Sequence, residues 1–142
     1  MLSFDLANQL SINASHRAGS RDTANAATAD GTGIDIGELE GTILVVVDAA
    51  VASTGETMTF TVEHSYDNST FTAVGADALV TPGTGAAATF TVNTASVAVF
   101  EVLALKRDRL RRYIRVKGTA AGNGTPAYVF ASYAIGVKKY AS

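Results

Sequence analysis

The sequence predicts an all-β protein, an antiparallel β-sandwich of about 7–8 strands with jelly-roll or Ig-like Greek-key connections and an extended N-terminal arm. Apolar and polar residues alternate with the two-residue period of half-buried strands. Turn signals rich in Gly, Asn and Asp separate these runs at short intervals. Helical periodicity is hard to find. Many short strands with such punctuation favour a sandwich or barrel over alternating β and α units.

Three runs carry the clearest strand pattern. In ETMTFTVEH, the side chains of Met58, Phe60 and Val62 point to one face, and threonines and Glu to the other. The runs ATFTV (88–92) and YIRVK (113–117) alternate in the same way. Because successive side chains of a strand point to opposite faces, each run predicts a strand with one face on the core.

Other runs differ in kind. TILVVV (42–47) is apolar on both faces, which favours a central strand. AYVFASYAIGV (127–137) predicts a long strand near the end of the chain. In SVAVFEVLALKRDRL (96–110) the β-branched start favours a strand, followed by a loop, although the later Leu and Ala positions permit a helical turn.

The chain length of 142 residues indicates one sandwich domain, expected over residues 31–142. Residues 1–30 are expected to form an N-terminal arm or edge segment. Within it, residues 13–30 are small and polar and offer no visible core anchor, so this segment is expected to become ordered mainly by contact with something else.

Reactive chemistry is sparse, so we expect no enzyme, no cofactor and no metal. There are no cysteines, which excludes disulfides, thiolate nucleophiles and zinc–thiolate sites. The two histidines, His16 and His64, have no nucleophile or ligand pattern around them. DGTG (30–33) lacks calcium-loop spacing and the lysine of a phosphate loop, so it predicts a tight turn. Asp67 and Asn68 are expected to be turn-formers.

No membrane span is expected. The apolar run TILVVVDAAVA is interrupted by Asp48 and is much shorter than the roughly 20 residues that cross a bilayer. No export signal is visible at the N-terminus. The chain is therefore expected to be soluble.

Charge is divided unevenly along the chain. Residues 1–105 hold two basic residues and twelve acids, a net of −10, whereas residues 106–142 hold nine basic residues and one acid, a net of +8. Such asymmetry indicates charge pairing within the fold or docking of a basic face on an acidic neighbour. The residues expected to contact a partner are Arg17, Arg21, Arg107, Arg109, Arg111, Arg115 and Lys117.

The stretch KRDRLRRYIRVK (106–117) has three interpretations: a protein contact or intersubunit ion pairing, a solvated strand with edge protection, or a nucleic-acid groove. The pI of about 5.6 and the single interleaved aromatic, Tyr113, count against nucleic acid. If a strand starts near Leu110, Arg112 faces inward near the rim of the sandwich, where its guanidinium reaches water or an acid.

Three stretches together resemble a group of small structural proteins of tailed bacteriophages. They are ATADGTGIDIGELEGTILVVVDAA, EHSYDNSTFTAVGADAL and RRYIRVKGTAAG, and the resemblance covers roughly residues 20–140. The matching positions are Asp30–Gly33, Asp35, Glu40, Gly41, Ser65, Asp67, Ser69–Thr72, Val74 and Arg112–Val116. Glu38 and Leu39 stand where the family often has an aromatic residue.

The resemblance implies a virion component on the capsid surface, made in the host cytoplasm. Its expected role is that of a head decoration or cement protein, which binds the major capsid protein, forms a homo-trimer and uses an N-terminal arm. The alternative is a phage neck or tail component or a host-adhesion module that binds carbohydrate. An enzyme on the same scaffold is the weakest alternative, because the chain has only two histidines and no cysteine; fold alone does not decide among these alternatives.

Overall fold

The computed structural model describes residues 9–22, 28–51, 57–80, 88–92, 99–121 and 127–139. In these residues the chain forms ten strands and two short 3₁₀ helices, η1 (Ala76–Ala78) and η2 (Arg107–Arg109). The strands are β1 (Leu10–Asp22), β2 (Thr28–Asp30), β3 (Ile34–Asp35), β4 (Leu39–Val51), β5 (Thr57–Ser65), β6 (Thr72–Ala73), β7 (Thr89–Val92), β8 (Val99–Lys106), β9 (Tyr113–Ala121) and β10 (Ala127–Lys138).

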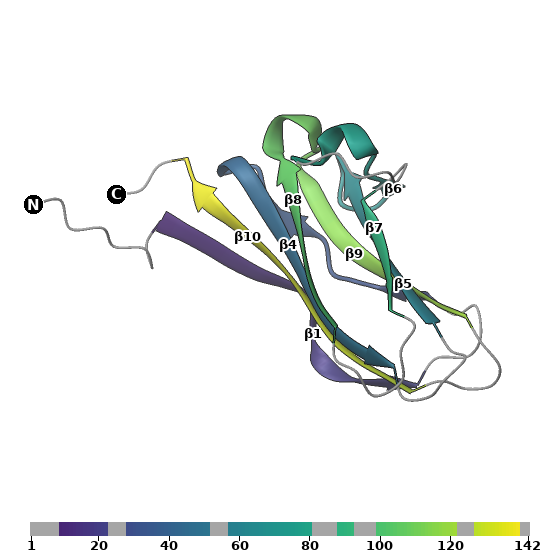
Figure 1. Ribbon diagram of the computed structural model, residues 1–142. Helices are drawn as coiled ribbons and strands as arrows, with labels where there is room; N and C mark the ends of the chain where they lie inside the picture. The colour runs from purple at the N-terminus through teal and green to yellow at the C-terminus, as the bar shows by residue number, and fades with distance from the viewer. Residues whose placement is uncertain are drawn as a thin grey trace, which may run out of the picture.

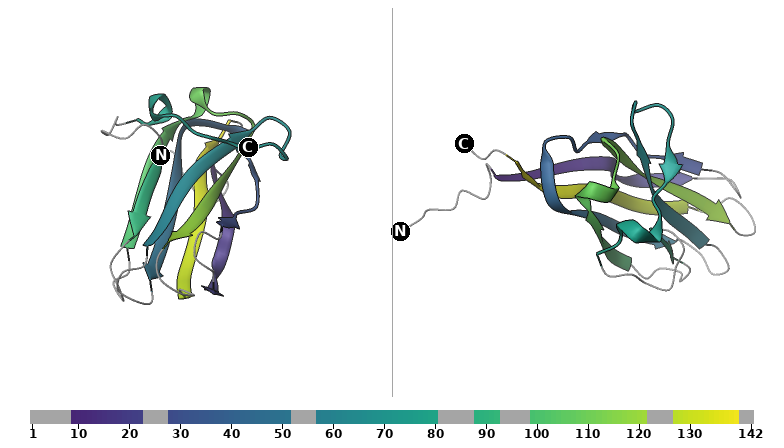
Figure 2. Two further views of the ribbon diagram at one scale, coloured as in Figure 1. Left: turned by 90° about the vertical axis from the view of Figure 1, so that its right-hand side faces the viewer. Right: turned by 90° about the horizontal axis from the view of Figure 1, so that it is seen from above.

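The strands form two antiparallel sheets that pack face to face (Figure 1). Sheet A has the order β1-β10-β4-β8. In sheet B, β9 pairs with β5; β2 and β3 pair along the other edge of β9, and β6 and β7 along the other edge of β5. Ten strands therefore fill eight positions. The long strands of both sheets run broadly along one axis in the two further views (Figure 2), as in an aligned sandwich.

The connectivity is that of a jelly roll. The chain passes from β1 in sheet A to β2 and β3 in sheet B, returns to β4 in sheet A, and enters β5 and its neighbours in sheet B. It then alternates through β8, β9 and β10. Eight strand positions in two interleaved sheets are the jelly-roll arrangement. The predicted all-β sandwich is confirmed, with jelly-roll rather than Ig-like connections.

The inner faces of the two sheets form the core. Phe60 of β5 and Phe130 of β10 meet across it edge to face, with ring centroids 5.2 Å apart. Full burial of one such side chain contributes roughly 1.5–3 kcal/mol. The predicted alternation in the run around Phe60 is confirmed. Other residues that share this core include Ile36, Ile43, Val45, Val47, Met58, Val62, Leu105, Ile114 and Val116.

The other predicted strands are also present. β4 lies between β10 and β8, which confirms its central position. β10 is the predicted long strand near the C-terminus. Val99–Lys106 is a strand followed by the single 3₁₀ turn of η2, as the strand-then-loop interpretation expects. Residues 96–98 of that segment lie outside the described residues.

The N-terminal segment has core anchors, contrary to expectation. β1 pairs with β10 from Leu10 to Asp22 and forms the edge of sheet A. Ser15 and His16 are buried. Polar side chains can anchor a strand where hydrogen bonds replace apolar contacts, which composition alone does not reveal. The division between an arm and a domain at residue 30 stays a prediction, and residues 1–8 and 23–27 lie outside the described residues.

The predicted tight turn at DGTG is wrong. Residues 31–33 form an irregular link between β2 and β3, and neither Gly31 nor Gly33 has a positive φ. Gly31 donates its N–H to Val116 O at 2.9 Å. A Cβ at Gly31 would lie 2.6 Å from that same carbonyl oxygen. Glycine is therefore needed here for close approach of two backbones rather than for a turn.

The second predicted turn is confirmed. Asp67 Oδ1 accepts hydrogen bonds from the backbone N–H groups of Ser69 at 3.0 Å and Thr70 at 2.9 Å, and from the hydroxyl of Ser65 at 2.8 Å. Asn68 takes the left-handed conformation with φ of 60°. Aspartate and asparagine form such turns because their short side chains bond to nearby backbone.

Candidate functional site

The predicted contact residue Arg115 is tied into sheet B. Its guanidinium lies 2.7 Å from Glu63 Oε2 and 3.3 Å from Asp30 Oδ2, and 4.3 Å from the ring centre of Phe71. Only 17% of the Arg115 side chain is exposed. Lys117 Nζ approaches Glu63 Oε1 at 3.9 Å. These two cations pair with acids from earlier in the chain, which accounts for part of the charge asymmetry in the sequence.

Arg107 also stabilises the fold, because its guanidinium donates to backbone carbonyl groups. Its Nε donates to Ile36 O at 2.9 Å and its Nη1 donates to Leu110 O at 3.1 Å. The first bond holds the loop of η2 against the segment before β4, and the second lies within that loop. A guanidinium with several donors in fixed geometry suits such backbone carbonyls.

The remaining basic residues of this region lie nearer to solvent. Arg109 is exposed on η2. The Arg111 guanidinium lies 4.6 Å from the ring centre of Tyr66. Arg112 reaches an acid at the rim, since its Nη2 lies 2.8 Å from Asp35 Oδ2. The hydrogen bond from Arg112 lowers the pKa of Asp35 and, reciprocally, raises that of Arg112.

The seven predicted contact residues lie on several different elements. Arg17 is exposed on β1, and Arg21 pairs opposite Tyr128 at the far edge of sheet A. The other five lie on η2, on β9 or on the link between them. A contact of any of these residues with a partner stays a prediction; among those whose side chains are described, Arg17 and Arg109 are exposed.

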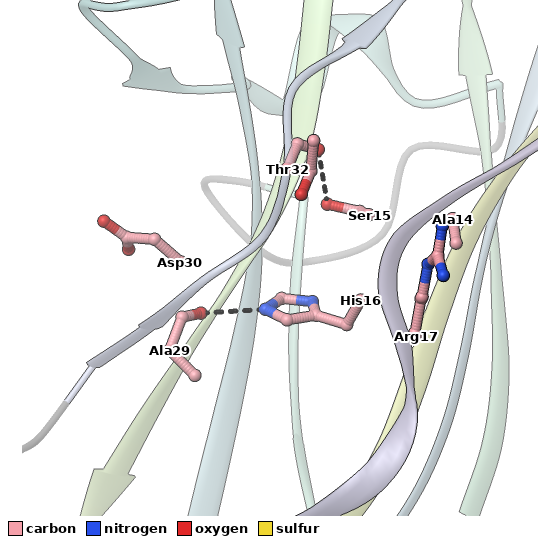
Figure 3. Close-up of a pocket in the computed structure, with 7 residues that line it drawn as sticks. All are labelled: Ala14, Ser15, His16, Arg17, Ala29, Asp30 and Thr32. Atoms are coloured by element: carbon pink, nitrogen blue, oxygen red, sulfur yellow. Dashed lines mark hydrogen bonds between the residues drawn. The ribbon is translucent and has the colours of Figure 1, made fainter.

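A polar groove of about 490 Å³ lies where the edges of the two sheets approach each other (Figure 3). β1 provides one wall, and β2 with the residues after it provides the other. Ser15 joins the two sheets here, because its Oγ donates to Thr32 O at 3.1 Å and accepts the N–H of Val116 at 2.9 Å. A second hollow continues along β3 and shares Arg17 and Thr32.

His16 forms one side of this groove. Its Nε2 donates to Ala29 O at 3.1 Å, and its Nδ1 lies 2.8 Å from Ser132 Oγ. With Nε2 as the donor, Nδ1 of the neutral ring accepts the Ser132 hydroxyl hydrogen. The ring packs edge to face on Phe130 at 4.8 Å.

The Ser132–His16 pair does not form a nucleophile site. Ser132 has no exposed surface and His16 retains 4%. A nucleophile must reach the carbonyl or phosphoryl group that it attacks. The pair therefore joins β1 to β10 and β2. Sequence reasoning placed His16 in an arm and had no signal for this role, because Ser132 is 116 residues away along the chain.

The other histidine and the acids offer little coordination chemistry. His64 lies half-buried in β5, where burial foremost and the Arg111 charge second lower its pKa. Among the described residues, no group of three or more His, Asp or Glu side chains is placed to hold a metal ion.

None of the helices in the described part of the chain has the length and hydropathy of a membrane span.

The outer faces of the two sheets differ sharply. Sheet B presents a polar outer face, which includes the threonines of β5 and β7 and the Arg115 network. Sheet A presents an apolar outer face, with Ile12 63%, Phe100 65% and Val102 45% exposed. We refer to this second surface as the A face. The sequence signal for it is TILVVV (42–47), which is apolar on both faces, although a central strand position explains that pattern equally well.

No protein-family model matches the sequence, and no curated protein matches it. Solved structures do match the fold. The structure of the infectious bursal disease virus Gt strain aligns with a TM-score of 0.55 and 10% identity, over 94% of this chain and 34% of the viral chain. The VP2 subviral particle of infectious bursal disease virus aligns with a TM-score of 0.54 and 9% identity, over 92% of this chain and 32% of that chain.

The chain therefore spans about a third of these viral chains. At such low identity, the likeness establishes a shared β-sandwich fold. A pilus subunit of Bacillus endospore appendages aligns over 97% of both chains at 16% identity, with a TM-score of 0.46, too low to support an argument. The class of protein that fold and surface define is a small jelly-roll module whose described polar clusters hold its own strands together.

Proposed function

We propose that this chain is a non-enzymatic structural protein of a virion, a head decoration or cement protein of a tailed bacteriophage that binds the major capsid protein as a homo-trimer on the capsid surface. The observation that carries the proposal is the jelly-roll fold shared with the virus particle structures over more than nine-tenths of this chain. The motifs around Asp30–Gly33 and Arg112–Val116 that resemble phage structural proteins add the phage assignment.

The distribution of polar chemistry supports a structural role. The best-connected polar groups, His16 with Ser132 and Arg115 with Glu63, join strands that are distant in sequence. An active site would need a reacting group that is both activated and reachable. The buried pairs of this chain are satisfied and enclosed instead.

Co-sedimentation tests the proposal. The purified protein is mixed with intact phage heads that lack it and centrifuged, and its stoichiometry on the heads and its mass alone in solution are measured. Saturable binding to the heads is the expected result, with a trimer in solution. Failure to bind any phage head, or turnover of a small substrate by the protein, would contradict the proposal.

The exposed Arg109 provides the sharpest test of a basic contact. Charge reversal of Arg115 would break its ion pair with Glu63 and so destabilise the fold. Arg109→Glu instead changes an exposed side chain. We expect Arg109→Glu to weaken head binding at low salt and leave the denaturant midpoint unchanged. Arg112→Gln is the matched control, because it changes an exposed arginine that is not among the predicted contacts.

A host-adhesion or neck and tail module is the second candidate. Tyr66 favours it, because this ring is 74% exposed and lies beside the Arg111 guanidinium. Exposed aromatic rings present flat apolar surfaces on which sugars pack. Binding on a glycan array that is lost in Tyr66→Ala, together with no binding to heads, would favour this candidate.

A further inference from the structure

The A face carries most of the large apolar side chains that are exposed in the described residues. Six large apolar side chains are exposed in the described part of the chain, and four of them point outward from sheet A: Ile12, Phe100, Val102 and Val137. A fifth, Val80, adjoins this face at the β8 edge, next to the bridge between Leu79 and Leu105.

The centre of the A face is continuous. Val46 of β4 keeps only 8% exposure although it points outward, because its cross-strand neighbours are Tyr133 of β10 and Val102 of β8. Leu44 and Ile135 pair beside them. A solvated sheet face would alternate to polar residues at these positions, as the outer face of sheet B does. Contiguous apolar surface of this kind marks an interaction site.

Charge lies only toward the two ends of this face. Asp48 points outward beside Phe100 at one end, and Lys106, opposite Thr42, lies at the other end together with the exposed Glu40, opposite Val137. None of these three residues forms an ion pair with another described residue. Asp48 and Lys106 are on adjacent strands, and Phe100 and Lys106 are six residue steps apart along β8, about 20 Å at ~3.3 Å per residue.

We propose that the A face binds the A face of a second copy of this chain, in a two-fold contact with antiparallel strand directions. A two-fold axis in the contact plane, perpendicular to the strands, brings Asp48 of one copy over the Lys106 end of the other, and this pairing occurs twice. The apolar centre then meets the apolar centre. A two-fold contact requires a self-complementary surface. The A face meets this requirement through its apolar centre and through the opposite charges of Asp48 and Lys106 at its two ends.

The size of the face sets the strength of the contact. Four strands at ~4.8 Å spacing and about seven residues at ~3.3 Å cover roughly 440 Å² in projection, or about 900 Å² for both copies. Stable dimers bury about 1,600 Å², and interfaces below about 1,200 Å² are weak or transient. The contact is therefore expected to form at micromolar or higher concentrations, or between copies held side by side. It holds with or without a capsid, and it would join two trimers where trimers form.

Sedimentation equilibrium tests the contact. The expected mass rises with concentration toward twice its value at low concentration, which is 14.6 kDa for a monomer and three times that for a trimer. Val102→Asp, which places a charge at the centre of the face, is expected to weaken association at least tenfold with an unchanged denaturant midpoint, because Val102 is already 45% exposed. Tyr66→Asp is the control, since it removes the most exposed apolar side chain outside the A face.

Charge exchange tests the orientation. Asp48→Lys and Lys106→Asp are each expected to weaken association several-fold, and the double exchange to restore it. Because the chain contains no cysteine, mixing Asp48→Cys with Lys106→Cys is expected to give a mixed disulfide dimer under mild oxidation.

Several results would overturn the proposal. A mass that does not change with concentration would do so, as would a concentration-dependent doubling that Val102→Asp leaves intact or that Tyr66→Asp weakens equally. A trimer that depends on Val102 would contradict the two-fold geometry. Loss of head binding in Val102→Asp, in a protein that never self-associates, would assign the A face to the capsid instead.

Discussion

Replacing His16 by alanine tests how β1 is held to the sandwich. The substitution removes three contacts at once: the bond to Ala29 O, the bond to Ser132 Oγ and the edge-to-face contact with Phe130. All three join β1 to other strands. We therefore expect the loss to weaken the whole protein and, most strongly, the pairing of β1.

The magnitude follows from these contacts. A polar group that loses its partner costs about 1 kcal/mol, which applies to the part-buried Ala29 O and to the hydroxyl hydrogen of Ser132, whereas Ser132 Oγ still accepts the backbone N–H of residue 16. Loss of a packed ring against Phe130 adds about 1 kcal/mol. The sum is about 3 kcal/mol, or a fall in Tm of roughly 10 °C for a domain of this size.

Urea denaturation measures the global cost, and amide hydrogen exchange measures the local one. Faster exchange is expected along β1 and the facing residues of β10 than elsewhere in sheet A. His64→Ala is the matched control: His64 is half-buried and its Nδ1 accepts only a long 3.4 Å bond from the Arg111 N–H, so about 1 kcal/mol or less is expected. A cost for His16→Ala equal to that of His64→Ala, with unchanged exchange in β1, would refute this reasoning.

Three further changes test other contacts. Glu63→Gln leaves Arg115 largely buried with only Asp30 as an acidic partner, so a loss of about 2 kcal/mol is expected by urea denaturation. Asp35→Asn breaks its ion pair with Arg112, in which the Asp35 side chain is 44% exposed and the Arg112 side chain 61%. We therefore expect the free energy of unfolding to fall by less than about 1 kcal/mol, and this difference to disappear in concentrated salt. Equal losses for Glu63→Gln and Asp35→Asn would contradict this ranking. The hydrogen bonds to Asp67 lower the pKa of its carboxyl far below 3.8, so the ionised form stabilises the fold above about pH 4 and this contribution is lost as the pH falls further. The difference in urea midpoint between the protein and Asp67→Asn should therefore stay constant from neutral pH to about pH 5 and shrink below about pH 4; a difference that grows on acidification would exclude the mechanism.

Local patterns were sufficient for the strands. The alternation around Phe60 and Ile114 predicts their inward orientation, because side chains of a strand must alternate and only one face meets the core. The turn at Asp67 was predictable for the same local reason, since its hydrogen bonds reach only two or three residues along the chain. The tight turn expected at DGTG failed because the constraint on Gly31 comes from Val116, a distant residue.

The sequence by itself determined the fold class and most strand positions, since these depend on side-chain period and turn chemistry within a few residues. Only the tertiary structure decided which polar groups meet: His16 with Ser132, and Arg115 with Glu63. It also decided which strand face is left uncovered. Pairing across more than 50 residues depends on strand order and register, and local propensity does not encode either.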